Sequence, residues 1–203
     1  MGRKRQPATK RGNQGTAGEL RIIGGDWRSR KLRFPDAGGV RPTPARTRET
    51  LFNWLTFHLA GSRCLDLFAG SGALGLEALS RGAAGTTFVE HNPDLAQALR
   101  QNLRILQCSH ATVACQGVET FLDGPPAETF DVVFMDPPFR QGWLERLYPL
   151  LSQRPWLCPG GWVYVEHESE LTPPPPPANW QLHRQKRAGQ VCYTLYRVAL
   201  PED

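Results

Sequence analysis

The most chemically specific stretch of the chain is Asp136-Pro137-Pro138-Phe139, which follows the apolar residues 132–135. Such an apolar run predicts a buried strand, and open α/β sheets bind ligands at the carboxyl ends of their strands. Consecutive prolines have fixed dihedrals and no N–H, so their carbonyls are rigid acceptors. A carboxylate and a carbonyl can hold both hydrogens of a planar exocyclic amine while an aromatic ring stacks on its base. The tetrad therefore predicts an amine made nucleophilic for attack on an electrophilic methyl group.

A second constellation is a glycine loop, Gly70-x-Gly72-x-x-Gly75, directly after a short buried-type strand at residues 64–68. Strand, glycine turn and helix form the nucleotide-binding opening of a doubly wound fold, because glycines let the backbone approach the ligand. Glu90 ends the next strand, twenty residues after Gly70. A carboxylate at that place can accept hydrogen bonds from ribose hydroxyls.

The glycine loop by itself also fits a nicotinamide-dependent oxidoreductase. Two features count against that reading. An acid, Asp66, lies inside the strand before the loop, and the chain has neither a second substrate domain nor an evident catalytic Tyr-Lys or His arrangement. The Asp-Pro-Pro-aromatic tetrad therefore favours chemistry on an amine over a nicotinamide-dependent oxidoreductase.

The elements that must position these residues alternate between strands and helices, which predicts an α/β fold with a mostly parallel sheet. The predicted strands are residues 64–68, 86–89, 111–115, 130–135 and 162–166. The predicted helices are residues 45–59, a helix from residue 74 that stops at Gly82, and residues 93–106, 119–122 and 143–151. Residues 180–183 and 191–196 predict a terminal antiparallel hairpin.

Positive charge is concentrated at the start of the chain. Residues 1–18 carry +5, residues 19–60 carry +4 and residues 61–203 carry −4, which together give the net charge of +5. A basic amino-terminal region is typical of a protein that faces a polyanion. Residues 1–17 hold too few apolar side chains to form a core, so we predict a disordered basic tail. A solvated arm that aids solubility explains this tail as well as a nucleic-acid contact does.

Residues 18–60 are predicted to form a small extension in front of the sheet domain of residues 61–203. Residues 20–23 and 31–34 predict a β-hairpin, and Thr43 is a candidate cap for the helix at 45–59. Aromatic and basic side chains here suit stacking and phosphate contact, although an exposed turn and a solvated helix face are the plain alternatives. The candidate nucleic-acid contacts of this region are Trp27, Arg28, Arg30, Lys31, Arg41, Arg46 and Arg48.

Several classes of protein and site are disfavoured by composition. No segment reaches the roughly 18 apolar residues of a membrane span, and no apolar region follows the basic start as in a secretory signal. The five cysteines are odd in number and never spaced as Cys-x-x-Cys, which favours neither a disulfide framework nor a zinc site. We therefore expect a cytoplasmic protein without a metal.

Two sets of motifs carry a resemblance to a known family. Residues 65–72, Leu-Asp-Leu-Phe-Ala-Gly-Ser-Gly, together with the tetrad, resemble the class I S-adenosylmethionine-dependent amino-methyltransferases. More narrowly, residues 22–25, Trp27-Arg28, residues 41–43 and residues 48–53 resemble the RsmD family of bacterial 16S rRNA guanine-N2 methyltransferases. The likeness runs from about residue 18 to 198, nearly the whole chain except the basic tail.

The resemblance implies a Rossmann-like, seven-stranded class I fold and a monomeric enzyme. Its implied activity is methylation of one guanine N2 in 16S rRNA, on an assembled or assembling small ribosomal subunit, with S-adenosylhomocysteine as the second product. The cofactor residues that it implies are Asp66, Phe68, Ala69, Gly70, Ser71, Gly72, Glu90, Gly117, Val118 and Thr43. The family usually has Asn or Asp where Gly117 stands, so the backbone of Val118 is the expected reader of the adenine edge.

On the substrate side, the resemblance implies that Asp136 and the Pro137 carbonyl hold the target amine, with Pro138 and Phe139 completing the catalytic set and Arg140 contacting the RNA. Three alternatives remain at this point. A DNA adenine-N6 methyltransferase uses the same tetrad but generally carries a target-recognition insertion, for which no stretch here is long enough. A glutamine methyltransferase would prefer Asn at position 136, and a non-enzymatic RNA-binding module would not bind the cofactor.

Overall fold

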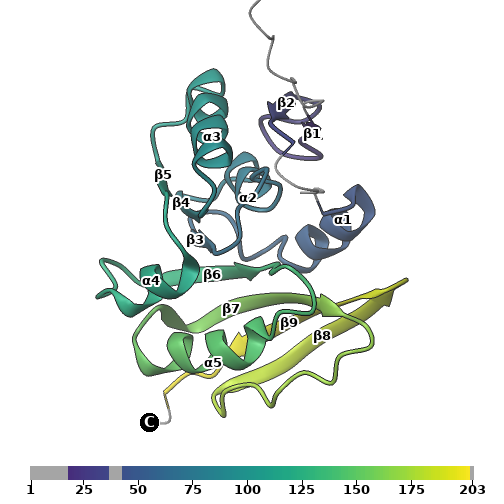
Figure 1. Ribbon diagram of the computed structural model, residues 1–203, viewed down its shortest axis with the longest axis vertical. Coiled ribbons are helices and arrows are strands. Elements are labelled where there is room, and N and C mark those ends of the chain that lie inside the picture. Colours follow the sequence, from purple (N-terminus) through teal and green to yellow (C-terminus); the bar gives the residue numbers. More distant parts are fainter. Residues whose placement is uncertain (1–17, 37–42, 202–203) are drawn as a thin grey trace, which may run out of the picture.

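The computed structural model describes residues 18–36 and 43–201 (Figure 1). The predicted tail at 1–17 and the candidate contact Arg41 lie outside these residues. One seven-stranded sheet has the order β5-β4-β3-β6-β7-β9-β8. Its strands are β3 (Arg63–Asp66), β4 (Gly85–Val89), β5 (Ala111–Ala114), β6 (Phe130–Met135), β7 (Leu157–Glu168), β8 (Trp180–Ala188) and β9 (Val191–Val198).

The predicted mostly parallel sheet with a terminal antiparallel hairpin is confirmed. β5, β4, β3, β6 and β7 are parallel, and β9 pairs antiparallel with both β7 and β8. The chain builds outward from β3 through β4 to β5, then crosses back to place β6 on the other side of β3. Open α/β sheets bind ligands in a crevice outside the carboxyl ends of the strands at such a reversal, which here are β3 and β6. The glycine loop and the Asp-Pro-Pro-Phe tetrad follow those two strands.

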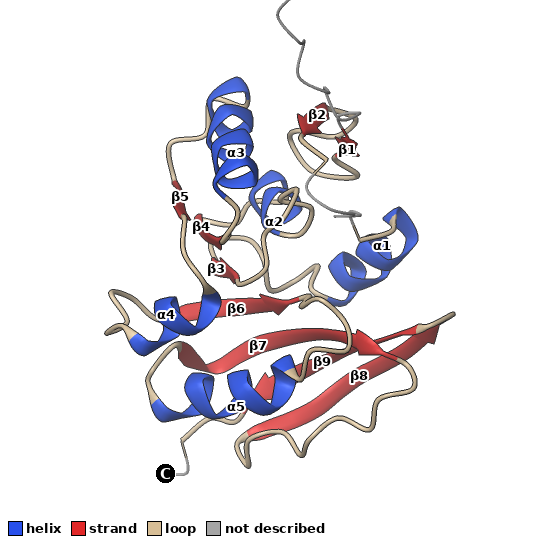
Figure 2. Ribbon diagram, in the orientation of Figure 1, coloured by secondary structure: helices blue, strands red, loops and turns tan. Residues whose placement is uncertain are grey.

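The helices flank the sheet on both faces (Figure 2). Their bounds are α1 (Ala45–Trp54), α2 (Gly75–Ser80), α3 (Pro93–Ile105), α4 (Val118–Asp123) and α5 (Trp143–Gln153). Alternate residues of β6 divide the core: Val132 and Phe134 pack with α1, while Val133 and Met135 pack with α4 and α5. A strand buried on both faces explains the continuous apolar run from which the sheet was predicted.

The extension also contains a hairpin of β1 (Gly18–Arg21) and β2 (Lys31–Phe34), so the first strand begins two residues earlier than predicted. α1 ends at Trp54 rather than at residue 59, because the chain turns there and the His58 N–H bonds the Leu55 carbonyl at 2.8 Å. The expectation that Thr43 caps this helix is wrong. Pro44 occupies the cap position without a side-chain hydrogen bond, and the Thr43 hydroxyl points elsewhere.

Glu77, a fully buried acid in α2, joins the extension to the sheet domain. Its two carboxylate oxygens accept the backbone N–H groups of Ile23 and Gly24, each at 2.8 Å. The guanidinium of Arg81 donates to it at 2.8 Å, and that of Arg48 lies 3.5 Å away. One buried negative charge thus holds the hairpin, α1 and α2 together.

We expect Glu77→Gln to destabilise the fold by roughly 3–5 kcal/mol, because it leaves the Arg48 charge buried without its partner. Urea unfolding followed by tryptophan fluorescence measures the loss. The matched control is Glu119→Gln, which breaks an exposed ion pair with Arg146 and should cost at most about 1 kcal/mol. Equal and small losses for the two variants would show that the network contributes no net stability.

Candidate active site

Asp136 stands directly after β6, at the crevice between β3 and β6. The Thr43 hydroxyl donates a hydrogen bond of 2.9 Å to its Oδ2 atom, across 93 positions of sequence. Desolvation raises the pKa of Asp136 to about 6, and the Thr43 hydrogen bond opposes that rise. Asp136 is therefore mostly ionised at neutral pH and serves as an acceptor of hydrogen bonds.

The rest of the tetrad leads from the interior to the surface. Pro137 is buried, Pro138 is exposed, and the Phe139 side chain is 38% exposed. The ring of Phe139 is thus open to a planar partner beside Asp136. Arg140 follows in a left-handed conformation, with φ of 61°, and its N–H bonds the Glu168 carboxylate at 2.9 Å.

Glycine is needed in the loop after β3 for two separate structural reasons. Gly70 and Gly72 have positive φ angles of 51° and 83°, which favour glycine. At Gly72 a Cβ atom would lie 2.5 Å from Leu99, and at Gly75 it would lie 2.2 Å from Phe88. The second and third glycines therefore allow α2 to pack closely on the sheet and on α3, while Gly70 shapes the loop itself.

Two further carboxylates hold this loop in place. The Gly75 N–H at the start of α2 donates to Asp66 at 2.9 Å. The Glu90 carboxylate, after β4, accepts N–H groups from Gly70 at 2.8 Å and from Asn92 at 2.7 Å. Ser71 and Ala69 are both buried, so the loop presents mainly its backbone.

These acids form a concentration of negative charge. Desolvation raises the pKa of Asp66 to about 7, and the charges of Asp136 and Glu90 contribute to the rise. Among the residues that the structure describes, no Lys or Arg forms an ion pair with Asp66, Glu90 or Asp136. A site of this kind fits a cationic ligand, and S-adenosylmethionine carries positive charge on both its ammonium and its sulfonium groups.

Two residues that the family resemblance assigns to the cofactor's adenine lie at the start of α4. Gly117 is the exposed N-cap residue of α4, and Val118 is buried as its first residue. Phe68 meets Trp143 edge to face at 5.0 Å between ring centroids, and the Arg146 guanidinium lies 3.9 Å from the Trp143 ring. These contacts give the crevice an aromatic wall.

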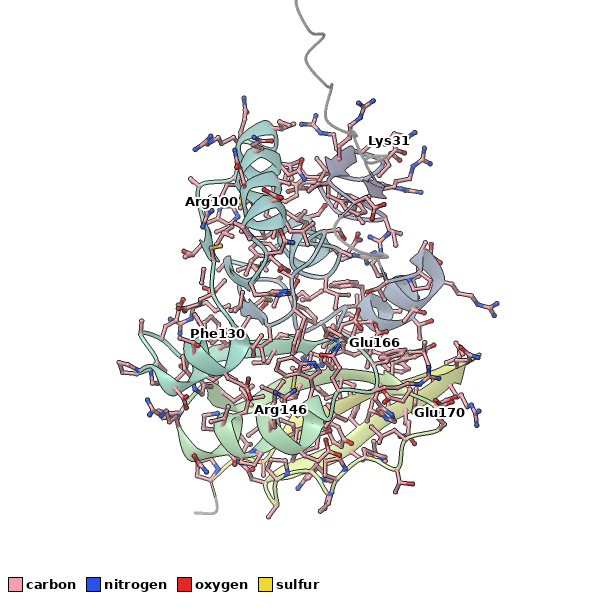
Figure 3. All side chains as sticks on the ribbon, in the orientation of Figure 1. Lys31, Arg100, Phe130, Arg146, Glu166 and Glu170 are labelled. Carbon is pink, nitrogen blue, oxygen red and sulfur yellow. The ribbon has the colours of Figure 1, made fainter. Side chains whose placement is uncertain are left out.

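Glu166 is a site residue to which the sequence analysis assigned no role. It follows Val165, which pairs with Met135, so Glu166 lies on β7 beside Asp136, which directly follows β6. The Tyr164 hydroxyl donates to it at 2.6 Å. Burial and the adjacent Asp136 charge raise the pKa of Glu166 well above its usual range. Figure 3 shows Glu166 in the interior of the molecule. In the sequence, the position of Glu166 at the end of the predicted strand 162–166 was the available signal for a site residue.

The candidate RNA contacts divide into two groups. Arg48 is only 4% exposed, and its guanidinium bonds the carbonyls of Thr43 and Arg21, so the prediction of an RNA contact there is wrong. Desolvation lowers the pKa of Arg48, and the Glu77 charge opposes that fall. Trp27 is half-buried and packs against the core beneath the hairpin, which matches the plain alternative.

The other cations are exposed: Arg28, Arg30, Lys31, Arg46 and Arg140. Lys31 pairs with Glu19 at 2.9 Å, and Arg140 pairs with Glu170 at 2.7 Å. Arg30 donates to the Ile105 carbonyl at 3.3 Å. Their side chains are accessible to a polyanion, which would compete with the two acids for Lys31 and Arg140.

Comparison with known proteins gives the family. The family described as Conserved hypothetical protein 95 matches residues 20–197. The ribosomal RNA small subunit methyltransferase D of Escherichia coli K12 is 50% identical over 190 residues, which are 93% of this chain and 94% of that protein. The protein of the same name from Haemophilus influenzae is 47% identical over 89% of this chain and 94% of its own. The chain belongs to the RsmD family.

Solved structures agree with this assignment. The structure called putative methyltransferase yhhF from Escherichia coli has a TM-score of 0.84 and 50% identity, covering 91% of this chain and all of that one. An RNA methyltransferase from Salinibacter ruber in complex with S-adenosyl-L-homocysteine has a TM-score of 0.60 at 18% identity, with 80% of this chain and 98% of that chain covered, and it supports the fold alone. In the described ranges, the structure has no helix long and apolar enough to cross a membrane and no cluster of three metal-binding side chains.

The raised pKa values of Asp66 and Asp136 predict that S-adenosylmethionine binding weakens as the pH falls from 8 to 5.5. Protonation removes the negative charges that attract the cationic cofactor, and binding near pH 6.5 should release protons. Calorimetry in two buffers of different ionisation enthalpy measures both effects. Asp66→Asn should flatten the profile, whereas Asp94→Asn, an exposed change in α3, should leave it as in the wild type. A pH-independent affinity in the wild type would contradict the assignment.

Proposed function

We propose that this protein transfers a methyl group from S-adenosylmethionine to the exocyclic N2 of one guanine in the 16S rRNA of the small ribosomal subunit. The observation that carries the proposal is the Asp136 carboxylate, held by Thr43 beside the glycine loop at the switch point of the sheet. Membership of the RsmD family supports rRNA as the substrate, because its curated relatives bear that activity in their names.

We infer the following roles for the chain's own residues. When bound, S-adenosylmethionine supplies an electrophilic methyl group on a sulfonium. Asp136 and the Pro137 carbonyl accept the two hydrogens of the guanine amine, while Phe139 stacks on the base. This hold directs the nitrogen lone pair toward the methyl group and stabilises the positive charge that develops on the nitrogen. S-adenosylhomocysteine would be the second product, and the Asp136 carboxylate would take the proton that the amine loses.

Glu90 and the loop of residues 69–72 would bind the ribose and methionine parts of the cofactor, with Asp66 behind them and Gly117-Val118 along the adenine. Arg28, Arg30, Lys31 and Arg46 would contact the RNA backbone. We place the enzyme in the cytoplasm as a monomer that acts on the assembled or assembling particle. The five cysteines are all free thiols, in keeping with a reducing compartment.

Asp136→Asn should reduce the rate of methyl transfer to unmodified small subunits by about 10²–10³-fold, because the amide loses the negative charge opposite the reacting nitrogen. Calorimetric affinity for S-adenosylhomocysteine should change little. Incorporation of labelled methyl groups measures the rate, and Asp94→Asn is the matched control. Full activity in the Asp136 variant would remove this residue from catalysis. Methyl incorporation into plasmid DNA but not rRNA would instead favour adenine-N6 methylation.

Thr43→Val should move the acid limb of the rate profile to higher pH. The Thr43 hydroxyl stabilises the ionised form of Asp136, so its loss raises the pKa of Asp136 above about 6, and the ionised form is the active one. Single-turnover rates between pH 5 and 8 measure the shift. Thr50→Val, which removes an exposed hydroxyl bonded within α1, is the control. An unshifted limb would mean that another group sets the profile.

A further inference from the structure

The outer strand of the sheet carries a basic surface that lies outside the amino-terminal region. After Trp180, every residue of β8 is exposed. We use the name β8 surface for His183, Arg184 and Lys186 of this strand together with Arg197 of the adjacent β9. Figure 1 shows β8 at the edge of the molecule, with the β8–β9 hairpin extending beyond α1.

Strand register places these side chains on one face of the sheet. Arg184 pairs with Leu195 and Lys186 pairs with Tyr193, and paired residues share a face. Leu195 and Tyr193 belong to the core that α1 covers, and Tyr193 lies 5.6 Å from the Trp54 ring of α1. Arg184 and Lys186 therefore continue the α1 side of the sheet to its open edge.

Aromatic rings are interleaved with these cations. The rings of His58 and His183 lie 4.6 and 4.9 Å from the Trp162 ring, and the Arg197 guanidinium lies 5.4 Å from it. Phe57, next to His58, is 93% exposed. Trp162 is only 5% exposed, so the accessible rings are those of Phe57, His58 and His183. Cations beside accessible rings suit a single-stranded nucleic acid, which is bound by phosphate contact and base stacking.

The positive charge of this surface is not neutralised by the protein. In the part of the chain that the structure describes, no Asp or Glu forms an ion pair with Arg184, Lys186 or Arg197. The pKa of His183 is lowered by partial desolvation and then by the charges of Arg184, His58 and Arg197, so these groups lie within electrostatic reach of one another. The three cations Arg184, Lys186 and Arg197, with no acid paired to them, attract a polyanion.

The β8 surface begins at the catalytic edge. The hairpin tip pairs Ala188 with Val191, and Val191 lies opposite Glu168, whose carboxylate binds the Arg140 N–H next to the tetrad. α1 starts at the same edge, close to the Thr43–Asp136 hydrogen bond. From there the surface runs toward Trp162 at the opposite end of β7. An RNA strand leaving the active site can follow it without crossing the acidic crevice.

We propose that the β8 surface binds the sugar–phosphate backbone of the rRNA strand that flanks the target guanine. This inference rests on the proposed function and adds a second RNA contact to the amino-terminal extension. Arg184 and Lys186 contact phosphates, and Phe57 offers a ring to an unpaired base.

Cations on an edge strand also have a simpler use, which is to prevent the strand from pairing with another chain. That use requires charge but no RNA, and it predicts self-association when the charge is removed. The two explanations are therefore separated by one pair of measurements on the same variant.

The test is Arg184→Gln/Lys186→Gln, compared with Arg63→Gln/Arg154→Gln. The second pair removes the same charge from exposed residues at the amino ends of β3 and β7. The binding partner is the unmodified small subunit, titrated at several salt concentrations, and single-turnover methylation at saturating subunits gives the chemical rate. Calorimetry with S-adenosylhomocysteine confirms that each variant is folded.

The β8 variant should lower the log–log salt slope by roughly 1.4–1.8, for two lost phosphate contacts, with the saturating rate unchanged. The control pair should leave the slope as in the wild type. A wild-type slope in the β8 variant overturns the inference, and a wild-type slope with new self-association in sedimentation assigns the cations to edge protection. If the wild-type enzyme does not methylate small subunits at all, the proposed function fails instead.

Discussion

The buried carboxylate of Glu77 is the constraint on which the arrangement of the site depends. A charge removed from water must be compensated, and here the compensation comes from the hairpin backbone, from Arg81 and from Arg48. Because these partners belong to the hairpin, α2 and α1, their relative positions are fixed by one residue. α2 in turn starts at Gly75, which bonds Asp66 at the glycine loop. The anchor of the extension and the residue that bonds Asp66 thus lie two positions apart in one short helix.

Arg48 extends this constraint to the reacting group. Its guanidinium lies against Glu77 and donates to the Thr43 carbonyl at 3.1 Å, while the Thr43 hydroxyl donates to Asp136. A continuous chain of polar contacts therefore runs from the anchor of the extension to the tetrad. The extension therefore contacts Asp136 directly, and the Thr43 hydrogen bond opposes the rise in its pKa that desolvation causes. An arginine that the sequence suggested for the RNA instead holds the residue that bonds Asp136.

Local patterns predicted what depends on local physics. α3 was expected at residues 93–106 and spans Pro93–Ile105, since Asn92 caps it and its apolar face is regular. The parallel sheet followed from buried strands in alternation with helices. Partners distant in sequence could not be predicted in this way: Glu77 lies 29 positions from Arg48, and Thr43 lies 93 from Asp136. A buried arginine in an amphipathic helix has the same pattern as a solvated one until its partner is placed.

The net charge of a segment also could not predict the charge of its surface. Residues 61–203 sum to −4, which suggested that only the first sixty residues face a polyanion. The sum counts buried and exposed charges alike, whereas only the exposed charges face a partner. Asp66, Glu77 and Glu166 are buried, where they are paired or have raised pKa values, so little of their charge reaches the surface. Arg184 and Lys186 are fully open to solvent on β8. A domain of negative net charge can therefore present a positive surface, because several of its acids are buried.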